Sequence, residues 1–565
     1  MCARWFLTGL LICLFLSTDT KAQQYYAYAV SFRDKQGSTG SLSNVSAFLS
    51  SRAITRRYLQ GIAVDTTDLP VSIVYIDSAL SITNGMLHET SKWLNLCVIV
   101  VADSDTSKIS ILQSKLYVTD IKYVANYATY HPKSNPQNNT GKFNNNASFK
   151  TTWSAAYYGV TYPQVSFVQG DCLHNLGYMG QGKLIAVLDA GFSGTDTHPG
   201  FDSLFLNNQV LDWHNFTLNN NSVYGYDSHG TSCLSTMAGN WPDTFVGNAP
   251  NAQYALYVTE DNSSEQPIEL YNLVAGTERA DSLGADIISC SLGYDTFDPP
   301  FGVNYFNFST DFDGKTTVAA RGVNFAAKKG ILFVTSAGND ATFSQWPHIL
   351  TPSDADSALT VGAVQFNAAP YVASGPGPNA AGQVKPDICD VGVSVDVFTQ
   401  NGGIATEDGT SFSTPQIAGL VACLWQAAGN VSPHAIRAAI DSTGDHHTNP
   451  GAQLGYGIPN FCQALQILDV KDTPKNPMGT DWIRVGPNPI SGNTIELHVY
   501  LTTNQTISFR LLDISGREVL SKQISLYSGY NSPVYLPFNG YLPSGMYILK
   551  ASSATRQQVI KVEKL

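Results

Sequence analysis

Charged residues are scarce in this chain of 565 residues: Asp, Glu, Lys and Arg together make up only 13%. Lys and Arg number 32 against 44 Asp and Glu, so the formal net charge is −12 at pH 7. A general nucleic-acid-binding protein needs a basic face for the phosphates, and this charge balance argues against one. With 43% hydrophobic residues the chain can bury large cores, which excludes global disorder. Its length predicts several domains.

Long apolar runs are also missing. In the body of the chain none reaches the roughly 18 residues that a membrane-spanning helix needs, which excludes a polytopic membrane protein. Near the start, residues 5–16 form an apolar stretch too short to span a bilayer, preceded by Arg4 and followed by the small residue Ala22. This pattern is typical of a secretory signal peptide, so we predict one over residues 1–22, cleaved after Ala22. An uncleaved anchor is the alternative, and the short run disfavours it.

Cysteines are few and scattered. The chain has nine, of which Cys2 and Cys13 would leave with the signal peptide. The remainder is odd in number and contains no close pair, no CxxC motif and no Cys/His cluster, so we expect neither a disulfide framework nor a zinc site. Cys233, Cys290 and Cys423 lie among apolar or small residues, which predicts buried core thiols.

Composition and patterning divide the mature chain into three domains. Residues 23–130 mix short β-like runs with helical stretches and predict a small α+β domain, followed by an Asn-rich linker over residues 131–150. In residues 151–470, short apolar strands alternate with longer helical stretches, which predicts an α/β fold on a parallel sheet covered on both faces. After a second linker, residues 471–480, the last residues (481–565) carry only strand signals and predict a β-sandwich.

Four short motifs in the α/β domain carry polar residues at structurally special places. An apolar strand ends at Asp189, and His229 opens an apolar, helix-like run. Asn339 follows another strand, and Ser411 stands in the block GTSFSTP at the start of an apolar helix. Each alone has an ordinary explanation, as a turn former, a buried histidine or a helix cap. One shared site explains all four together better, because functional residues gather at the carboxyl ends of parallel strands.

The residue types fit nucleophilic catalysis. A serine at a helix N-terminus lies near unpaired N–H groups that can hold an oxyanion, and an Asn amide can donate to the same charge. A histidine can take the serine proton, and a carboxylate can orient that histidine by accepting its Nδ1 proton.

The chain order Asp189, His229, Asn339, Ser411 and the residues around each of them resemble the subtilisin-like serine peptidases, or subtilases, over about residues 180–460. The resemblance implies a three-layer subtilisin-like fold. In it Ser411 would be the nucleophile, His229 the general base and Asp189 the carboxylate that orients it. Asn339 and the backbone N–H of Ser411 would form the oxyanion hole. The sequence departs from the family pattern at Ala190, where a hydroxyl residue usually follows the catalytic Asp.

The resemblance also implies where substrate binds. Residues 254–258 resemble the edge strand that pairs with the substrate residues before the cleaved bond, and residues 291–293 resemble the opposite wall of the cleft. The predicted substrate-binding residues are Tyr254, Leu256, Ser291, Leu292, Gly293 and Gly338. No cofactor is expected for the chemistry. Calcium often stabilises this family, but we assign no ligands, because calcium sites use backbone carbonyls that a sequence does not reveal.

The flanking domains resemble known companions of secreted enzymes. The α+β domain resembles the inhibitory propeptides of subtilases, which implies a zymogen matured by a cut between about residues 125 and 152. An accessory domain retained in the mature enzyme is the alternative. At the other end, residues 486–489, 513–517 and 542–547 resemble the sorting domains of the type IX secretion route of Gram-negative bacteria. That implies the outer-membrane secretion machinery as a partner, with a carbohydrate-binding or folding module as the alternative.

We therefore predict a serine endopeptidase that is secreted or held at the cell surface and cleaves peptide bonds through an acyl-enzyme. Protein or peptide substrates are expected, with no nucleic acid and no transmembrane segment. An adhesion protein on an inactive protease scaffold is disfavoured because all four site residues are present. An esterase is disfavoured because no Gly-x-Ser-x-Gly motif frames Ser411. Activity should rise as His229 loses its proton, near the ordinary pKa of about 6.5.

Overall fold

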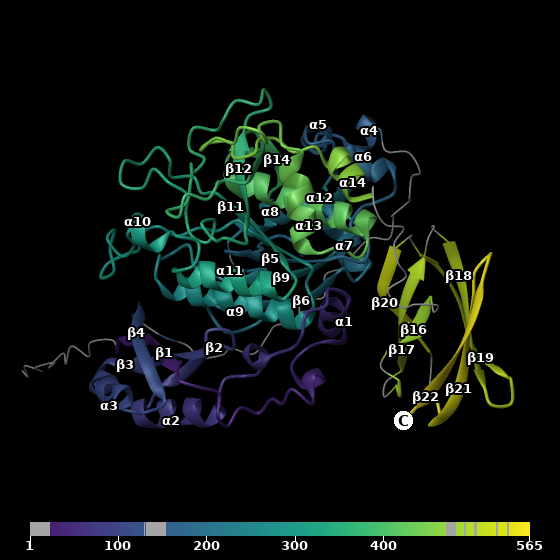
Figure 1. Ribbon diagram of the computed structural model, residues 1–565, viewed down its shortest axis with the longest axis horizontal. Helices are drawn as coiled ribbons and strands as arrows, with labels where there is room; N and C mark the ends of the chain where they lie inside the picture. The colour runs from purple at the N-terminus through teal and green to yellow at the C-terminus, as the bar shows by residue number, and fades with distance from the viewer. Residues whose placement is uncertain are drawn as a thin grey trace, which may run out of the picture.

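The computed structural model describes residues 23–128, 130, 154–225, 227–469, 482–486, 488–490, 493–501, 505–526, 529–538 and 542–565. The predicted signal peptide and both predicted linkers lie outside these residues. Figure 1 shows an N-terminal domain in purple and dark blue, a large central domain in blue to green, and a C-terminal pair of sheets in yellow.

The central domain is built on a sheet whose strands are ordered β13-β12-β11-β10-β5-β9-β6. Neighbouring strands all run parallel. The first of them in the chain, β5, lies between β9 and β10, so the chain leaves it in both directions across the sheet. In parallel sheets such a reversal opens a crevice at the carboxyl ends of the strands, where ligands bind. The strands are β5 (Leu184–Asp189), β6 (Val210–Asn215), β9 (Gln253–Val258), β10 (Ile287–Cys290), β11 (Leu332–Ser336), β12 (Leu359–Val364) and β13 (Ile388–Val391).

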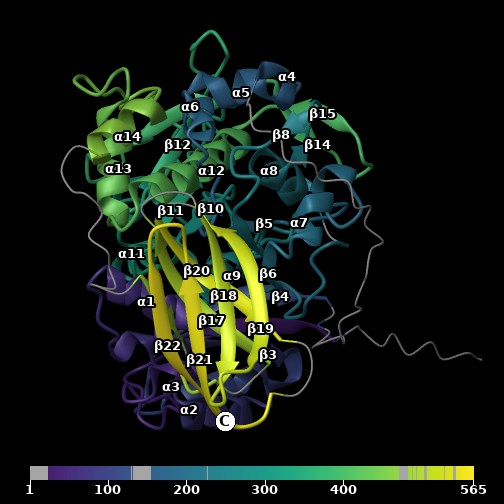
Figure 2. The ribbon, with the colours of Figure 1, turned by 90° about the vertical axis from the view of Figure 1, so that its right-hand side faces the viewer.

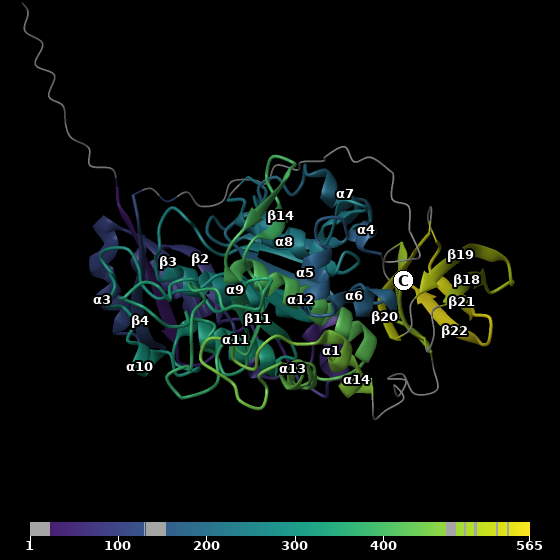
Figure 3. The same cartoon turned by 90° about the horizontal axis from the view of Figure 1, so that it is seen from above.

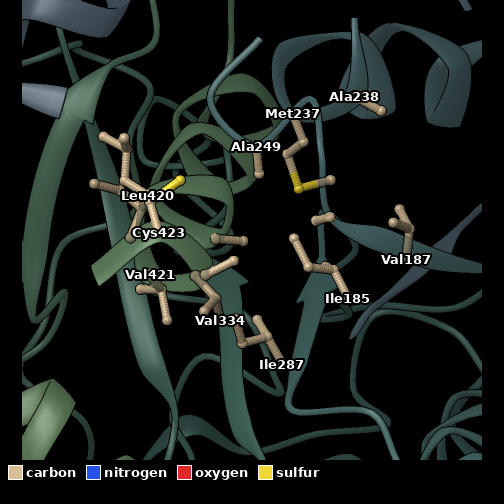
Figure 4. Packing of buried hydrophobic residues seen from close by; sticks show 14 of the residues in the cluster. Ile185, Val187, Met237, Ala238, Ala249, Ile287, Val334, Leu420, Val421 and Cys423 are labelled. Atoms are coloured by element: carbon tan, nitrogen blue, oxygen red, sulfur yellow. The ribbon is translucent and has the colours of Figure 1, made fainter. Parts of the chain in front are cut away.

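Helices cover both faces of this sheet, as the continuous apolar strands predict. Successive residues of β5 point into different cores: Ile185 and Val187 pack with residues of α8 and α12 (Figure 4), whereas Ala186 faces α9 and α11 on the other side. The helices are α4 (Ala155–Tyr158), α5 (Tyr162–Phe167), α6 (Gly170–Asn175), α7 (Asp202–Leu206), α8 (His229–Ala238), α9 (Ile268–Leu283), α10 (Phe308–Asp311), α11 (Val318–Lys328), α12 (Thr410–Ala428), α13 (Pro433–Ser442) and α14 (Phe461–Asp469). Two short hairpins complete the domain, β7 (Asn240–Trp241) with β8 (Phe245–Val246) and β14 (Val395–Phe398) with β15 (Ile404–Glu407).

The N-terminal domain is an antiparallel sheet, ordered β2-β3-β1-β4, with helices on one face. The other face of the sheet packs on α9 and α11 of the central domain, and one continuous apolar core crosses this boundary (Figures 1 and 3). Its elements are β1 (Tyr25–Phe32), α1 (Ser51–Leu59), α2 (Ile73–Thr83), β2 (Met86–Ser91), β3 (Leu96–Ala102), α3 (Ile109–Gln113) and β4 (Val118–Tyr127).

The C-terminal domain is the predicted β-sandwich. In the part of it that the structure describes, an antiparallel sheet β16-β17-β20 faces a second antiparallel sheet β19-β18-β21-β22 across a shared apolar core (Figure 2). The strands are β16 (Ile483–Val485), β17 (Thr494–Leu501), β18 (Gln505–Asp513), β19 (Glu518–Leu526), β20 (Gly529–Pro537), β21 (Gly545–Ser552) and β22 (Gln557–Lys564).

One expectation about the cysteines was wrong. Cys172 on α6 and Cys462 on α14 form a disulfide, with their Cα atoms 5.8 Å apart and a sequence separation of 290. Such a distant pair leaves no spacing signal, because only the folded domain brings α6 beside α14. Cys233, Cys290 and Cys423 are buried free thiols, as predicted.

Candidate active site

The carboxyl ends of the central strands bring the predicted site residues to one edge of the sheet. Asp189 is the last residue of β5, Ser291 directly follows β10, and Asn339 follows β11. His229 is the first residue of α8, and Ser411 lies in the first turn of α12. Both helices pack on the same face of the sheet, so their N-termini meet the strand ends at the crevice beside β5.

Asp189 and His229 form a direct pair. Nδ1 of His229 lies 2.7 Å from Oδ1 of Asp189, which also accepts a hydrogen bond from the backbone N–H of Ala190 at 2.8 Å. The Asp189 carboxylate is fully buried, whereas the His229 side chain is 30% exposed. The pair therefore joins a buried carboxylate to an imidazole that is partly exposed at the cleft.

The second oxygen of Asp189, Oδ2, is buried without a hydrogen-bond partner among the described residues. The residue that follows, Ala190, has no side-chain donor to offer it. The departure from the family pattern at Ala190 thus coincides with an unpaired oxygen, but the oxygen that orients His229 keeps both of its donors.

The charge of Asp189 controls the protonation of His229. Burial favours the neutral imidazole, but the adjacent Asp189 carboxylate outweighs it and raises the pKa of His229 well above 6.5. In its neutral form the imidazole is thereby held in the tautomer that carries the proton on Nδ1 and donates it to Asp189. Nε2 is then free to accept a proton from the cleft.

Ser411 lies beside this pair at the start of α12. Its Oγ is 3.4 Å from the carbonyl oxygen of Ser291, and the Ser291 hydroxyl donates in turn to the Ser411 carbonyl at 2.9 Å. Cys233, one helical turn after His229, contacts both residues: its Sγ is 3.8 Å from Nδ1 of His229 and 3.3 Å from the carbonyl oxygen of Ser411. His229 and Ser411 are therefore neighbours, although no hydrogen bond joins them within the described residues. Hydrogen bonds of this kind often form only when substrate is bound.

The side-chain amide of Asn339 is held in one orientation. Its Oδ1 accepts hydrogen bonds from the backbone N–H and the hydroxyl of Thr410, at 2.9 and 3.1 Å. Because the oxygen is occupied in this way, the Nδ2 donor faces the first turn of α12. Gly409 has φ of +149°, and a Cβ there would lie 3.3 Å from Nδ2 of Asn339. A glycine at this position lets the chain turn into α12 close against the amide.

The predicted substrate-binding residues fall into two groups. Gly293 and Gly338 converge on the side chain of Leu350, since a Cβ on either would clash with it, and both segments adjoin the Ser411 region. Tyr254 and Leu256 are fully buried in the central core. The prediction that they belong to an edge strand was wrong, because β9 is paired on both sides, with β5 and β6. A substrate chain therefore cannot pair with β9 itself.

Cys233 is the neighbour that the sequence did not reveal as part of the site. It was correctly expected to be a buried thiol, and the spacing of His229 and Cys233 on one helix was the available signal. Among the described residues, Asp189, His229 and Cys233 are the only three potential side-chain ligands of a metal ion that lie close together. Their closeness follows from the Asp–His pair, and this set contains none of the oxygen clusters that calcium prefers. These three residues therefore do not provide a site for the calcium that the family resemblance implied.

Comparison with known proteins agrees with this geometry. Residues 180–458 match the model of the subtilase family, residues 27–142 that of the peptidase S8 propeptide domain of Bacteroidota, and residues 484–564 that of the secretion system C-terminal sorting domain. Subtilisin from Bacillus pumilus is 28% identical over 305 residues, which are 54% of this chain and 98% of that protein. Subtilisin E from Bacillus subtilis (strain 168) is 27% identical over 305 residues, 54% of this chain and 70% of that protein.

A solved structure, the crystal structure of MycP1 with the N-terminal propeptide removed, is also similar. It covers 55% of this chain and 98% of its own, with 20% identity and a TM-score of 0.43.

The parallel sheet with its Asp–His pair and helix-borne serine is that of a subtilisin-like serine endopeptidase, a class that needs no cofactor for catalysis. Residues 180–458 form a domain of the subtilase family, with a propeptide domain before it and a sorting domain after it. The sorting domain indicates type IX export to the cell surface or the medium. Within the residues that the structure describes, no helix has the length and apolar character to cross a membrane.

Proposed function

We propose that this enzyme is a zymogen whose catalytic triad is Asp189, His229 and Ser411. The observation that carries the proposal is the 2.7 Å contact between Nδ1 of His229 and Oδ1 of Asp189, beside a serine in the first turn of α12. Nε2 of His229 takes the Ser411 proton as Oγ attacks the scissile carbonyl carbon. The same proton then passes to the leaving amine, and a water molecule activated by His229 hydrolyses the acyl-enzyme.

The negative charge that develops on the scissile carbonyl oxygen needs donors already in place. We assign this role to Nδ2 of Asn339 and the backbone N–H of Ser411. Thr410 fixes the Asn339 amide through its Oδ1, so the donor need not reorganise when the tetrahedral intermediate forms. The dipole at the N-terminus of α12 favours the same charge.

In the zymogen, residues 23–130 act as an inhibitory propeptide that is removed by a cut in the segment after β4. Its docking supports this role, because buried ion pairs and hydrogen bonds join it to α9 of the peptidase domain. Arg56 and Arg57 on α1 bind Asp281 of α9 at 2.6 and 2.7 Å. Glu278, also on α9, accepts hydrogen bonds from the Ser91 hydroxyl and the backbone N–H of Trp93. Such an interface holds the domain in one register on the peptidase.

The test is the intact mass of purified protein beginning at residue 23, followed over time in wild type and in Ser411→Ala. Wild type should lose an N-terminal segment of roughly 100–130 residues, and Ser411→Ala should stay full length. Ser413→Ala is the matched control, since it removes a hydroxyl from the same helix that only donates to the Thr410 carbonyl. It should process like wild type.

Two outcomes would contradict the proposal. If Ser411→Ala matures at the wild-type rate in the absence of any other protease, Ser411 is not the nucleophile. If wild type stays full length and, after the propeptide is cut with an added protease, neither cleaves peptides nor reacts with a serine-directed phosphonate, the scaffold is inactive and an adhesion role takes its place.

A further inference from the structure

Four acidic side chains border the candidate active site without any basic partner. Glu260 follows β9, Glu265 lies in the loop before α9, Asp295 follows the 291–293 segment, and Asp340 follows Asn339. We call these four residues the acidic rim. All four are half-buried, and within the described residues none forms an ion pair.

Backbone hydrogen bonds fix the acidic rim next to the catalytic groups. The N–H of Thr259 donates to the carbonyl oxygen of Asp189 at 3.0 Å, which places the next residue, Glu260, at the carboxyl end of β5. The loop that carries Glu265 is tied to the segment after Asp295, because the Glu265 N–H donates to Asp298 at 3.0 Å. Glu260 and Glu265 therefore stand on the chain that follows β9, Asp295 on the chain that follows β10, and Asp340 on the chain that follows β11.

No basic side chain within the described residues neutralises the carboxylates of the acidic rim. Burial and then the Asp189 carboxylate raise the pKa of Glu260 to about 7, and burial with Glu260 raises the pKa of Glu265 to about 9. By contrast, Asp387, a buried acid elsewhere in this domain, pairs with Lys385 and Arg437. A cation placed among the rim carboxylates would restore their charged forms.

A buried tyrosine hydroxyl faces the same place. Tyr294 is 1% exposed, and its hydroxyl makes no close hydrogen bond within the described part of the chain, although it lies near enough to the Glu260 carboxyl to favour the charged form of that group. Burial, and next the charge of Glu260, raise the pKa of this hydroxyl well above its usual value, so the group lies against the rim. An orphaned polar group at the edge of a cleft is one that a ligand would satisfy.

The propeptide indicates that a peptide chain approaches the site along this rim. The side chain of Gln266, next to Glu265, accepts a hydrogen bond from the backbone N–H of Asn126 at 2.7 Å and donates to the Asn126 carbonyl at 3.2 Å. Asn126 lies near the end of β4, at the start of the segment in which we place the maturation cut. The acidic rim therefore borders the surface on which the last residues of β4 lie.

A metal ion fits the acidic rim poorly. A compact metal site needs its ligand atoms close together, and within the described residues the rim carboxylates do not form such a group. An ammonium or guanidinium group on a long side chain can instead reach between spaced carboxylates and donate to several of them.

We propose that the acidic rim recognises a lysine or arginine side chain of the substrate, at one of the four residues before the cleaved bond. This proposal rests on the proposed peptidase function. It names the substrate class: peptides with a basic residue on the N-terminal side of the scissile bond.

The test compares kcat/KM for peptide sets that carry lysine or norleucine, and arginine or citrulline, at each of those four positions in turn. Norleucine keeps the four-carbon stem of lysine without the ammonium group, and citrulline keeps the shape of arginine without its charge. At one position or more, mature wild type should prefer the basic peptide by at least about tenfold. Glu260→Gln and Glu265→Gln should each reduce that ratio several-fold while norleucine peptides are still cleaved. Glu407→Gln, an exposed acid of the same domain, should leave the ratio unchanged.

The outcomes distinguish a failure of this proposal from a failure of the proposed peptidase function. Norleucine and lysine peptides cleaved equally at every position would overturn the acidic rim and leave the peptidase intact, as would a preference that both glutamine variants retain. A preference that disappears with EDTA and returns with calcium would assign the rim to a metal instead. If no peptide is cleaved, the proposed function fails and this inference falls with it.

Discussion

At the scale of single residues, one ion pair sets the working pH of the site. His229 must be neutral to take the Ser411 proton, and Asp189 stabilises its charged form. The sequence alone predicted a change in rate near the ordinary histidine pKa of about 6.5. The buried carboxylate moves that expectation upward, because the pKa of His229 is raised well above 6.5.

We therefore predict that kcat/KM for a neutral peptide rises with pH through a midpoint above 6.5. Below the midpoint the imidazolium cannot act as base, so activity is lost as the pH falls. The profile should be measured between pH 5 and 10 at constant ionic strength. His446 offers a matched control, since it makes an equally short contact, 2.7 Å, to Asp445 on the surface. His446→Gln should leave the midpoint in place, and a wild-type midpoint at or below 6.5 would contradict the geometry.

The four polar residues of the site could be predicted because each lies in a distinctive local motif. The residues packed around them are harder to predict. Cys233, Glu260 and Tyr294 come from separate segments and meet only when β5, β9 and β10 align their carboxyl ends, and Cys233 alone has a sequence signal, its helical spacing from His229. Nothing in the local sequence of Glu260 distinguishes a cleft residue from an ordinary loop acid.

At the scale of secondary structure elements, most strands of the central sheet follow from continuous apolar runs. β6 reads VLDWHN and has no such run, because its place at the edge of the sheet leaves it half exposed. It pairs with the outer side of β9, so β9 is not the edge strand that the family resemblance implied for Tyr254 and Leu256.

The disulfide between α6 and α14 joins the first and last parts of the peptidase domain, so we expect it to stabilise that domain. Cross-links across long loops contribute about 2–5 kcal/mol, which predicts a fall in Tm of about 5–10 °C for Cys172→Ser/Cys462→Ser. Calorimetry on the Ser411→Ala background would avoid self-digestion. Reductant should lower the Tm of the parent to that of the double variant and leave the variant unchanged. Equal Tm values with and without the bridge would show that it contributes no stability.

At the scale of the whole molecule, the propeptide interface contains an acid that is poorly accommodated. Both carboxylate oxygens of Glu89, on β2, are buried without hydrogen-bond partners among the described residues. Burial and the nearby Glu278 raise the pKa of Glu89 well above 4.5. The residue also lines an interface cavity of about 360 Å³, together with His88, Lys92 and Arg279. The docked domain therefore holds a proton that the free domain would release.

The sign of the pH dependence follows from this proton. Below about pH 4.5 Glu89 is neutral in both states and costs the complex nothing. As pH rises toward its raised pKa, only the free propeptide ionises, so binding weakens with pH by at most about tenfold per unit. Asp281 cannot cause this trend, because its pKa is lowered by Arg56 despite its burial, and its stabilising effect is lost only in acid.

We predict that the mature enzyme releases its cut propeptide more readily at pH 8.5 than at pH 7, and that Glu89→Gln flattens this dependence. The comparison stays above the ordinary histidine pKa of about 6.5, because burial lowers the pKa of His88 in the same cavity to about 4 and favours docking as the pH rises toward 6.5. The amide stays neutral at both pH values and keeps the size of the side chain. The measurement is the concentration of processed complex at which half of the peptidase activity appears, taken as a function of pH. Asp77→Asn, an exposed acid on α2 of the same domain, serves as control and should retain the wild-type slope. If Glu89→Gln keeps that slope as well, the pH response arises from another group. The unpaired carboxylate of Glu89 then does not control release of the propeptide.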